Sequence, residues 1–406
     1  MRGTAFPQDL ILDLYRRALA AVEGRDCVRD WLRAHRMGEP YYLVALGKAA
    51  GAMAAGALEV DGEGLRSGLV ITRHGHLDDA AVYRDPRILA LEAGHPLPDE
   101  HSLAAGAALR LFLEQAPDDA RFLFLVSGGA SSLVEVPVDG VSLQDLRQLN
   151  LWLLGSGLPI AAVNRVRTAV SRIKGGQLAA ELHGRAATLL LMSDVPGDVP
   201  EGIGSGLLLP SVPQPLPELP ARFAALPLRR EPVPAAASID THLIASNRHA
   251  REAAAGAARA AGYAVEDHGP FPETDAAACG QRIAQLMLKA GKGVHVWGGE
   301  TTVKLPENPG QGGRNQHLAL AAARVLAGTD GVTLLAAGTD GSDGASDDAG
   351  ALVDGATLER GADAGYDAAD CLARADAGSF LEGSGDLVHT GPTGTNVMDL
   401  VIAFKT

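Results

Sequence analysis

The sequence predicts an α/β protein with two domains, and three observations support this. Short apolar runs alternate with Ala-rich helical stretches, which is the pattern of a mostly parallel sheet covered by helices. The chain has 406 residues, more than the size at which a single hydrophobic core usually stops growing. A Pro-rich stretch interrupts the alternation. We therefore expect a first domain at residues 1–208, a connection at 209–235 and a second domain at 236–406.

The strand candidates are apolar runs bounded by small or polar residues, and the helix candidates are longer Ala- or Leu-rich segments. The expected strands are Tyr41–Leu46, Phe122–Val126, Thr188–Met192, Gly293–Trp297, Val332–Ala337 and Asp386–His389. The expected helices are Ala49–Leu58, Ser102–Gln115, Leu143–Leu154, Val163–Leu182, Asn247–Ala261 and Gln316–Leu326. Between Leu209 and Pro234 the prolines are too dense for a continuous helix or a central strand.

Composition argues against several classes of protein. The formal net charge of -14 at pH 7 would repel nucleic acid, and no basic stripe compensates it. The 3 cysteines form no CxxC pair and the histidines show no HExxH or comparable metal-binding spacing, which argues against disulfide and zinc frameworks. No apolar run approaches the ~20 residues of a membrane helix. We expect a soluble, cytoplasmic protein that binds neither nucleic acid nor membrane.

Each expected strand runs into residues rich in Gly, hydroxyls and carboxylates. In open α/β sheets, ligands bind in the crevice beyond the carboxyl ends of the strands. Such junctions are what a phosphate-and-metal site would use. A dinucleotide site is unsupported, because no GxGxxG follows a strand.

The loop from Ser127 to Ser132 and the Gly47-Lys48 junction are candidate phosphate-binding elements. Glycines let backbone N–H groups approach an anion, and Lys48 stands after a strand at the start of a helix. No lysine follows Ser127 at P-loop spacing. The alternatives are a tight turn for the loop and a solvated surface lysine for Lys48. The loop residues singled out for phosphate are Ser127, Gly128, Gly129, Ser131 and Ser132.

Acidic residues at strand ends are candidate magnesium ligands, since Mg²⁺ takes one or two carboxylates plus phosphate oxygens and waters. Asp194 stands at a strand terminus, and Asp340 lies nearest the strand end among four neighbouring aspartates. Glu300 follows two glycines. Turn chemistry alone also explains aspartates at such positions.

Two groups of basic residues remain. Arg314 lies in a Gly-rich loop that opens a helix and suits a carboxylate or phosphate, with a salt bridge to a nearby acid as the alternative. The others lie along the expected helix Val163–Leu182 and are interpreted as a solvated face. They are Arg165, Arg167, Arg172 and Lys174.

Taken together, the junctions resemble the glycerate 2-kinase family whose C-terminal part is called the MOFRL domain. Motif segments in the expected order span about residues 10 to 404. In the first half they are Ala45–Ala49, Ala93–Asp99, Val126–Leu133, Asn164–Arg167, Ser171–Gly176 and Ser193–Asp198. In the second half they are Gly298–Val303, Gly312–Gln316, Ala337–Gly341 and Gly391–Asn396.

The sequence departs from the family pattern at three places. Gly204-Ser205-Gly206-Leu207 replaces a segment closer to Ala-Ser-Gly-Pro, Ala130 replaces a frequent third glycine, and His317 replaces a common acidic residue. These departures bear on substrate choice and rate more than on the fold.

The resemblance implies a Rossmann-like parallel-sheet N-terminal domain, a mixed α/β C-terminal domain and an active site in the cleft between them. It implies phosphoryl transfer from ATP, with Mg²⁺, to the 2-hydroxyl of D-glycerate. The predicted catalytic residues are Lys48, Arg314 and Asp194, and the predicted metal ligands are Asp194, Glu300 and Asp340. Further phosphate- or nucleotide-binding residues are Thr393, Gly394 and Asn396.

Three rival functions stay open at this point. Some family members have carried the name hydroxypyruvate reductase, and a reductase would need a nicotinamide site, whose fingerprint the sequence lacks. A kinase for a related sugar acid would use the same residues. A non-enzymatic binding protein would not explain why carboxylates gather at strand ends.

Overall fold

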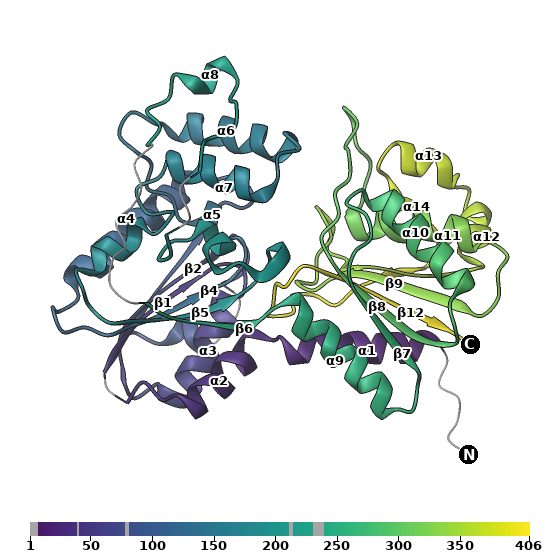
Figure 1. Ribbon diagram of the computed structural model, residues 1–406, viewed down its shortest axis with the longest axis horizontal. Helices are drawn as coiled ribbons and strands as arrows, with labels where there is room; N and C mark the ends of the chain where they lie inside the picture. The colour runs from purple at the N-terminus through teal and green to yellow at the C-terminus, as the bar shows by residue number, and fades with distance from the viewer. Residues whose placement is uncertain (1–6, 39, 78–80, 211–213, 230–238) are drawn as a thin grey trace. The chain divides into compact units, whose positions relative to one another are not determined.

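A computed structural model describes residues 7–38, 40–77, 81–210, 214–229 and 239–406 (Figure 1). The chain divides into two compact units. The N-terminal unit is Gly24–Ala245, and the C-terminal unit is Ser246–Thr406 together with Met1–Glu23. Among the described residues, no helix is long and apolar enough to cross a membrane.

The N-terminal unit is built on a 6-stranded sheet of order β3-β2-β1-β4-β5-β6, in which every neighbouring pair is parallel. The central strands are almost wholly buried because helices cover both faces, which is why they read as continuous apolar runs. In Figure 1, α2 and α3 lie on one face of this sheet and α4 and α5 on the other. The strands are β1 Tyr41–Leu46, β2 Leu65–Arg73, β3 Ile88–Ala93, β4 Phe122–Val126, β5 Ala187–Met192 and β6 Ile239–Ala245. The α-helices are α2 Gly24–Ala34, α3 Ala50–Asp61, α4 Glu100–Gln115, α5 Ala130–Leu133, α6 Leu143–Gly155, α7 Ile160–Ala169 and α8 Ala221–Ala224.

The described part of the Pro-rich stretch belongs to the N-terminal unit. Phe223 of α8 is buried in a cluster with α6 and α7 residues such as Leu149 and Val166. The expected boundaries therefore differ from the observed division, since strand β6 also completes the N-terminal sheet. Part of the expected connection, residues 211–213 and 230–235, lies outside the described residues.

The expected helix Val163–Leu182 is wrong in its second half. Helix α7 ends at Ala169, and a short 3-10 helix, Gln177–Leu182, follows after a break. Gly175 and Gly176 adopt φ of 65° and 87°, a left-handed conformation that a helix cannot contain. The four basic residues placed on this helix therefore do not share one face.

The C-terminal unit has a mixed 6-stranded sheet of order β11-β10-β9-β12-β8-β7. The final strand, β12, lies between β8 and β9 and is antiparallel to both. The expected strand Asp386–His389 is reduced to the two-residue edge strand β11. The strands are β7 Val265–Pro270, β8 Gly293–Gly299, β9 Val332–Gly338, β10 Gly350–Asp354, β11 Leu387–Val388 and β12 Asp399–Lys405. The α-helices are α1 Pro7–Ala21, α9 Asn247–Ala260, α10 Ala276–Lys289, α11 Arg314–Leu326, α12 Thr357–Asp363, α13 Ala368–Ala373 and α14 Ala377–Ser384.

Helix α1 belongs to this second unit, although it begins the chain. It lies beside α9 in Figure 1, and its buried Tyr15 donates a hydrogen bond of 2.5 Å to the carbonyl of Gly338 at the end of β9. The hydroxyl therefore fixes α1 against the edge of the sheet where polar residues gather.

Candidate active site

The sheet order of the N-terminal unit places two candidate loops at its topological switch point. Connections leave β1 and β4 toward opposite sides of the sheet, and ligands of such folds bind in the crevice between strands of this kind. The turn after β1 carries Lys48, and the loop after β4 carries Ser127–Ser132. Parallel pairing of β1 with β4 brings the two junctions to the same edge.

The two loops interlock through Ser127. Its buried hydroxyl accepts a hydrogen bond of 3.1 Å from the Ala49 N–H, and the Lys48 N–H donates to the Gly128 carbonyl at 2.9 Å. Gly47 has φ of 119°, and a Cβ there would stand 2.3 Å from the Ser127 hydroxyl. Ser127 thus joins the two loops, and its role as a direct phosphate donor stays a prediction.

Lys48, Gly129 and His95 approach one another beside this junction. Gly129 has φ of 86°, and a Cβ there would lie 3.1 Å from the His95 ring and 3.3 Å from the Lys48 side chain. The lysine is half-buried. A glycine is therefore required where a cation, an imidazole and a loop backbone come together.

The C-terminal end of the same loop is tied to two distant segments. The hydroxyls of Ser131 and Ser205 lie 2.8 Å apart, and the Ser205 hydroxyl donates to the Asn164 side chain at 3.1 Å. Ser132 is buried and bonds back to the Gly129 carbonyl at 3.4 Å. The predicted loop residues are thus fixed by side chains from α7 and from the segment after β5.

A buried ion pair involves Glu135, which follows this loop in the chain. It was not predicted from the sequence. Lys174 Nζ lies 2.6 Å from Glu135 Oε1, and both side chains are 1% exposed. Burial raises the pKa of Glu135 and lowers that of Lys174, while the attraction between the two charges opposes both shifts. Burial also lowers the pKa of Arg167, against the charges of Glu135 and Asp194. Two of the four residues interpreted as a solvated face, Arg167 and Lys174, therefore neighbour the candidate site.

In the C-terminal unit, Arg314 is paired with two acids. Its Nε and Nη2 atoms donate to the two oxygens of Asp399 at 2.6 Å and 3.0 Å, and Nη1 donates to Glu300 at 2.6 Å. The Asp399 side chain is 1% exposed and that of Arg314 is 35% exposed. The alternative interpretation of Arg314, a salt bridge to nearby acids, is thus what the structure contains.

Asp399 reaches this edge because β12 begins there. Its register partners are Gly299 at the end of β8 and Gly338 at the end of β9. An acid at the first residue of an antiparallel strand therefore joins groups at the carboxyl ends of its neighbours. The acids predicted as metal ligands all follow strands, whereas Asp399 begins one. The sequence signal for Asp399 is an acid directly before the apolar run from Leu400.

Asp343 positions the start of α11. Its carboxylate accepts hydrogen bonds from the backbone N–H groups of Asn315 and Gln316 at 3.0 Å and 2.8 Å. Burial raises its pKa to about 7, although these N–H groups oppose the shift. Asp343 was one of four aspartates that the sequence placed in this loop, and it holds the helix that carries Arg314.

The predicted residues Asp340 and Thr393 lie in two further loops at the same edge, after β9 and before β12. Asp340 accepts from the Ser342 N–H at 3.1 Å in an Asx-turn, and its charge contributes, after burial, to a raised pKa of Tyr15. Thr393 donates its hydroxyl to the Thr339 carbonyl at 2.5 Å, and Asn396 nearby in the chain is buried. The hydroxyl of Thr393 thus has a structural partner.

Comparisons with known proteins follow the same two parts of the chain. Residues 10–218 match the model of a domain of unknown function (DUF4147), and residues 293–399 match the MOFRL family model. A D-glycerate 2-kinase from Thermotoga maritima is 35% identical over 415 residues, covering 97% of each chain. These findings confirm the resemblance that the motifs indicated.

Two further comparisons bear on the fold and on the rival function. The crystal structure of glycerate kinase from Thermotoga maritima superposes with a TM-score of 0.83 at 34% identity, covering 98% of this chain and 99% of that one. A protein from Agrobacterium vitis named "Putative hydroxypyruvate reductase" is 38% identical over 383 residues, covering 88% of this chain and 85% of its own.

Proposed function

We propose, because this chain belongs to the glycerate 2-kinase family, that it transfers the terminal phosphoryl group of ATP to the 2-hydroxyl of D-glycerate. The products are 2-phosphoglycerate and ADP. The observation that carries the proposal is the meeting of Lys48, His95 and Gly129 at the switch point of a parallel sheet. Phosphoryl transfer needs positioning and charge neutralisation more than covalent chemistry, and this junction offers a cation beside a Gly-rich backbone.

We assign phosphate binding to the loop Gly128–Ser132 and Lys48. The glycines permit close approach of backbone N–H groups, and Lys48 supplies the positive charge. Ser127 supports these residues by joining the two loops. Gly394 and Asn396 keep their predicted role at the nucleotide, and Thr393 supports their loop.

Carboxylates within each unit remain the proposed magnesium ligands. Asp194 follows β5 in one unit, and Glu300 and Asp340 follow β8 and β9 in the other. All three offer oxygen donors, which Mg²⁺ prefers, and Glu300 and Asp340 are at least partly exposed. Magnesium, when bound, would neutralise charge on the phosphates.

Arg314 is assigned to the glycerate carboxylate. Asp399 fixes the guanidinium through Nε and Nη2, which orients the group without substrate. Nη1 donates a hydrogen bond to the exposed Glu300. A substrate carboxylate would replace Glu300 on this donor, and the local cation would hold an anion against the net charge of -14.

The reductase function is favoured by the printed names of relatives such as the protein from Agrobacterium vitis. The order of the N-terminal sheet is that of dinucleotide-binding folds, but the turn after β1 reads Gly47-Lys48-Ala49-Ala50-Gly51 and not GxGxxG. We therefore favour the kinase.

The purified chain should release ADP from MgATP when D-glycerate is present, and the product should be consumed by enolase without phosphoglycerate mutase. Enolase accepts 2-phosphoglycerate only, so this coupling separates the 2-kinase from a 3-kinase. Parallel reactions with L-glycerate and other 2-hydroxy acids define the substrate. NADH oxidation with hydroxypyruvate, without ADP release, would overturn the proposal.

A further inference from the structure

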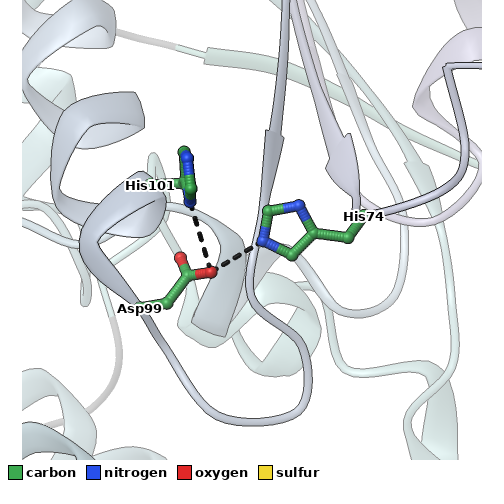
Figure 2. A group of neighbouring side chains, drawn as sticks. All are labelled: His74, Asp99 and His101. Carbon is green, nitrogen blue, oxygen red and sulfur yellow. Dashed lines mark hydrogen bonds and ion pairs between the residues drawn. The ribbon is translucent and has the colours of Figure 1, made fainter.

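A group of metal-ligating side chains lies outside the residues assigned above. His74 follows β2, Asp99 precedes α4, and His101 lies in the first turn of that helix (Figure 2). Their ligand atoms lie within 4.8 Å of one another. The three residues come from two segments separated by β3. No local spacing in the sequence therefore indicates that they form one group.

The two carboxylate oxygens of Asp99 have different partners. Its Oδ1 accepts from the N–H groups of Gly94 and Ser102 at 3.0 Å and 2.9 Å and from the Ser102 hydroxyl at 3.1 Å. Its Oδ2 faces the two imidazoles, as the dashed lines in Figure 2 show. Such a fixed orientation is what outer partners give to a metal-binding carboxylate.

Charge favours a cation at this oxygen. Burial opposes ionisation of Asp99, yet hydrogen bonds from His74, Ser102 and Gly94 hold its pKa well below the usual range. The carboxylate is therefore anionic at neutral pH. Imidazole and carboxylate together are donors that suit Zn²⁺ and its neighbours, whereas Mg²⁺ prefers oxygen alone.

The separation of His101 from Asp99 leaves room for an ion, whereas His74 is hydrogen-bonded directly to the carboxylate. His101 Nδ1 lies 3.6 Å from Asp99 Oδ2, beyond hydrogen-bond range. Bonds of about 2.0–2.2 Å at a tetrahedral ion place two donors about 3.3–3.6 Å apart. His74 Nε2, which is hydrogen-bonded to the same oxygen at 2.7 Å, would exchange that bond for the ion and move outward by about 0.6–0.9 Å to match that separation. Its ring is exposed.

A second cluster, in the C-terminal unit, provides a contrast. His295 donates Nε2–H toward the Gly291 carbonyl at 3.1 Å, which leaves Nδ1 to accept from His268 Nε2 at 3.0 Å. His268 also stacks on Trp297 with ring centroids 4.1 Å apart. Hydrogen bonding and stacking within the protein account for the positions of the two rings, although Glu266 completes a possible set of metal ligands there.

We propose that His74, Asp99 and His101 bind one divalent transition-metal ion of the zinc type through Nε2, a carboxylate oxygen and Nδ1. The ion joins the end of β2 to the start of α4, and a water completes a tetrahedral shell. The loop from β3 to α4 carries His95, whose ring leaves no room for a side chain at Gly129. The site is thus separate from the proposed magnesium ligands but linked by one loop to the phosphate-binding residues.

The test is titration of the metal-stripped full chain with ZnCl₂ against a chromogenic chelator, in millimolar Mg²⁺. We expect one equivalent of zinc to bind with micromolar or tighter affinity and to raise the melting temperature on the order of 5 °C at a hundredfold excess over Kd. Cobalt should bind at the same stoichiometry and show the absorption of a tetrahedral complex.

Two variants locate the ion. His101→Ala removes a ligand whose side chain is 67% exposed, and Asp99→Asn keeps a good N-cap while removing the charge. Each should weaken zinc binding at least about tenfold, since loss of an outer-shell partner alone costs 10–100-fold. The control, His268→Ala, should bind zinc as the parent does. Loss of binding in the control alone, or no saturable zinc binding by the parent, would overturn the proposal.

Discussion

In the N-terminal unit the candidate residues stand on loops that leave parallel strands, whereas in the C-terminal unit the same kind of edge also receives an incoming strand. The first arrangement brings Lys48 and the Ser127–Ser132 loop together at a switch point. The second adds Asp399 from the start of β12. Parallel topology collects only groups that follow strands, so a mixed sheet can assemble a denser set of charges at one edge.

The two units also differ in how they contain an ion pair. Lys174 and Glu135 are sealed from water, and Glu135 Oε2 has no hydrogen-bond partner among the described residues. Arg314 donates two hydrogen bonds to the buried Asp399, but about a third of the Arg314 side chain is exposed. The fully buried pair of Lys174 and Glu135 can only stabilise the fold. The partly exposed Arg314 keeps a hydrogen-bond donor near solvent.

The largest effect expected from this contrast is on stability in the N-terminal unit. Lys174→Met should lower the free energy of unfolding by about 3–5 kcal/mol, because it leaves the Glu135 charge buried without its partner. Adding Glu135→Leu should recover most of the loss. Urea unfolding of both variants measures this. A single variant as stable as the parent would mean that water reaches Glu135.

Arg314→Ala should cost less, about 3 kcal/mol, because its guanidinium is partly exposed while Asp399 is not. Arg314→Lys keeps the charge but loses the planar fork, so it should restore activity poorly. A double-mutant cycle separates the two roles of the arginine.

In that cycle, Arg314→Ala with Asp399→Asn should regain stability relative to Arg314→Ala alone, while turnover stays low. Unfolding in urea and steady-state kinetics with glycerate are both required. Turnover that returns together with stability would show that Arg314 acts only through the fold.

Lys48→Ala tests the opposite case, a cation assigned to the reaction. It should lower kcat by at least about 10²-fold, equivalent to about 2.7 kcal/mol, because the charge acts on the transferring group. The melting temperature should change little. Lys292→Ala is a matched control, since Lys292 also follows a glycine but is exposed and precedes a strand. Equal turnover in both variants would return Lys48 to the surface interpretation.

Strands that read as short apolar runs followed by Gly-rich residues could be predicted from the sequence. The sheet edge at their carboxyl ends could be predicted with them. The sequence located β1 and β4 with their observed bounds, and β5, β8 and β9 within two residues. Helix α7 was predicted too long because apolar periodicity continues past Ala169, and the left-handed glycines override it. The local sequence pattern was therefore sufficient to predict these strands and the loops that directly follow them.

Non-local partners were not predictable. The pair of Lys174 with Glu135 spans 39 positions and the pair of Arg314 with Asp399 spans 85. No periodicity relates residues that meet only through topology. Placement of α1 in the C-terminal unit has the same cause, because its partners lie more than two hundred residues later in the sequence.

The smallest expected effect concerns Thr393, which the sequence assigned to nucleotide binding. Its hydroxyl donates to Thr339, whose own hydroxyl donates to the Met398 carbonyl at 2.6 Å and accepts from the Val397 N–H at 2.8 Å. These bonds hold the loop against the start of β12. Thr393→Val keeps the shape and removes one neutral hydrogen bond, which should cost about 1 kcal/mol.

A loss of about 1 kcal/mol lowers the melting temperature of a unit of this size by about 2–4 °C. KM for MgATP should stay within about twofold, because the hydroxyl is directed to protein and not to ligand. Thr390→Val is the matched control, since Thr390 is exposed in the same segment and its hydroxyl donates to the adjacent Gly391 carbonyl. A large rise in KM for MgATP with an unchanged melting temperature would restore Thr393 as a nucleotide ligand. It would also mean that the loop rearranges when nucleotide binds, so that the C-terminal edge would be less rigid than the phosphate-binding loop.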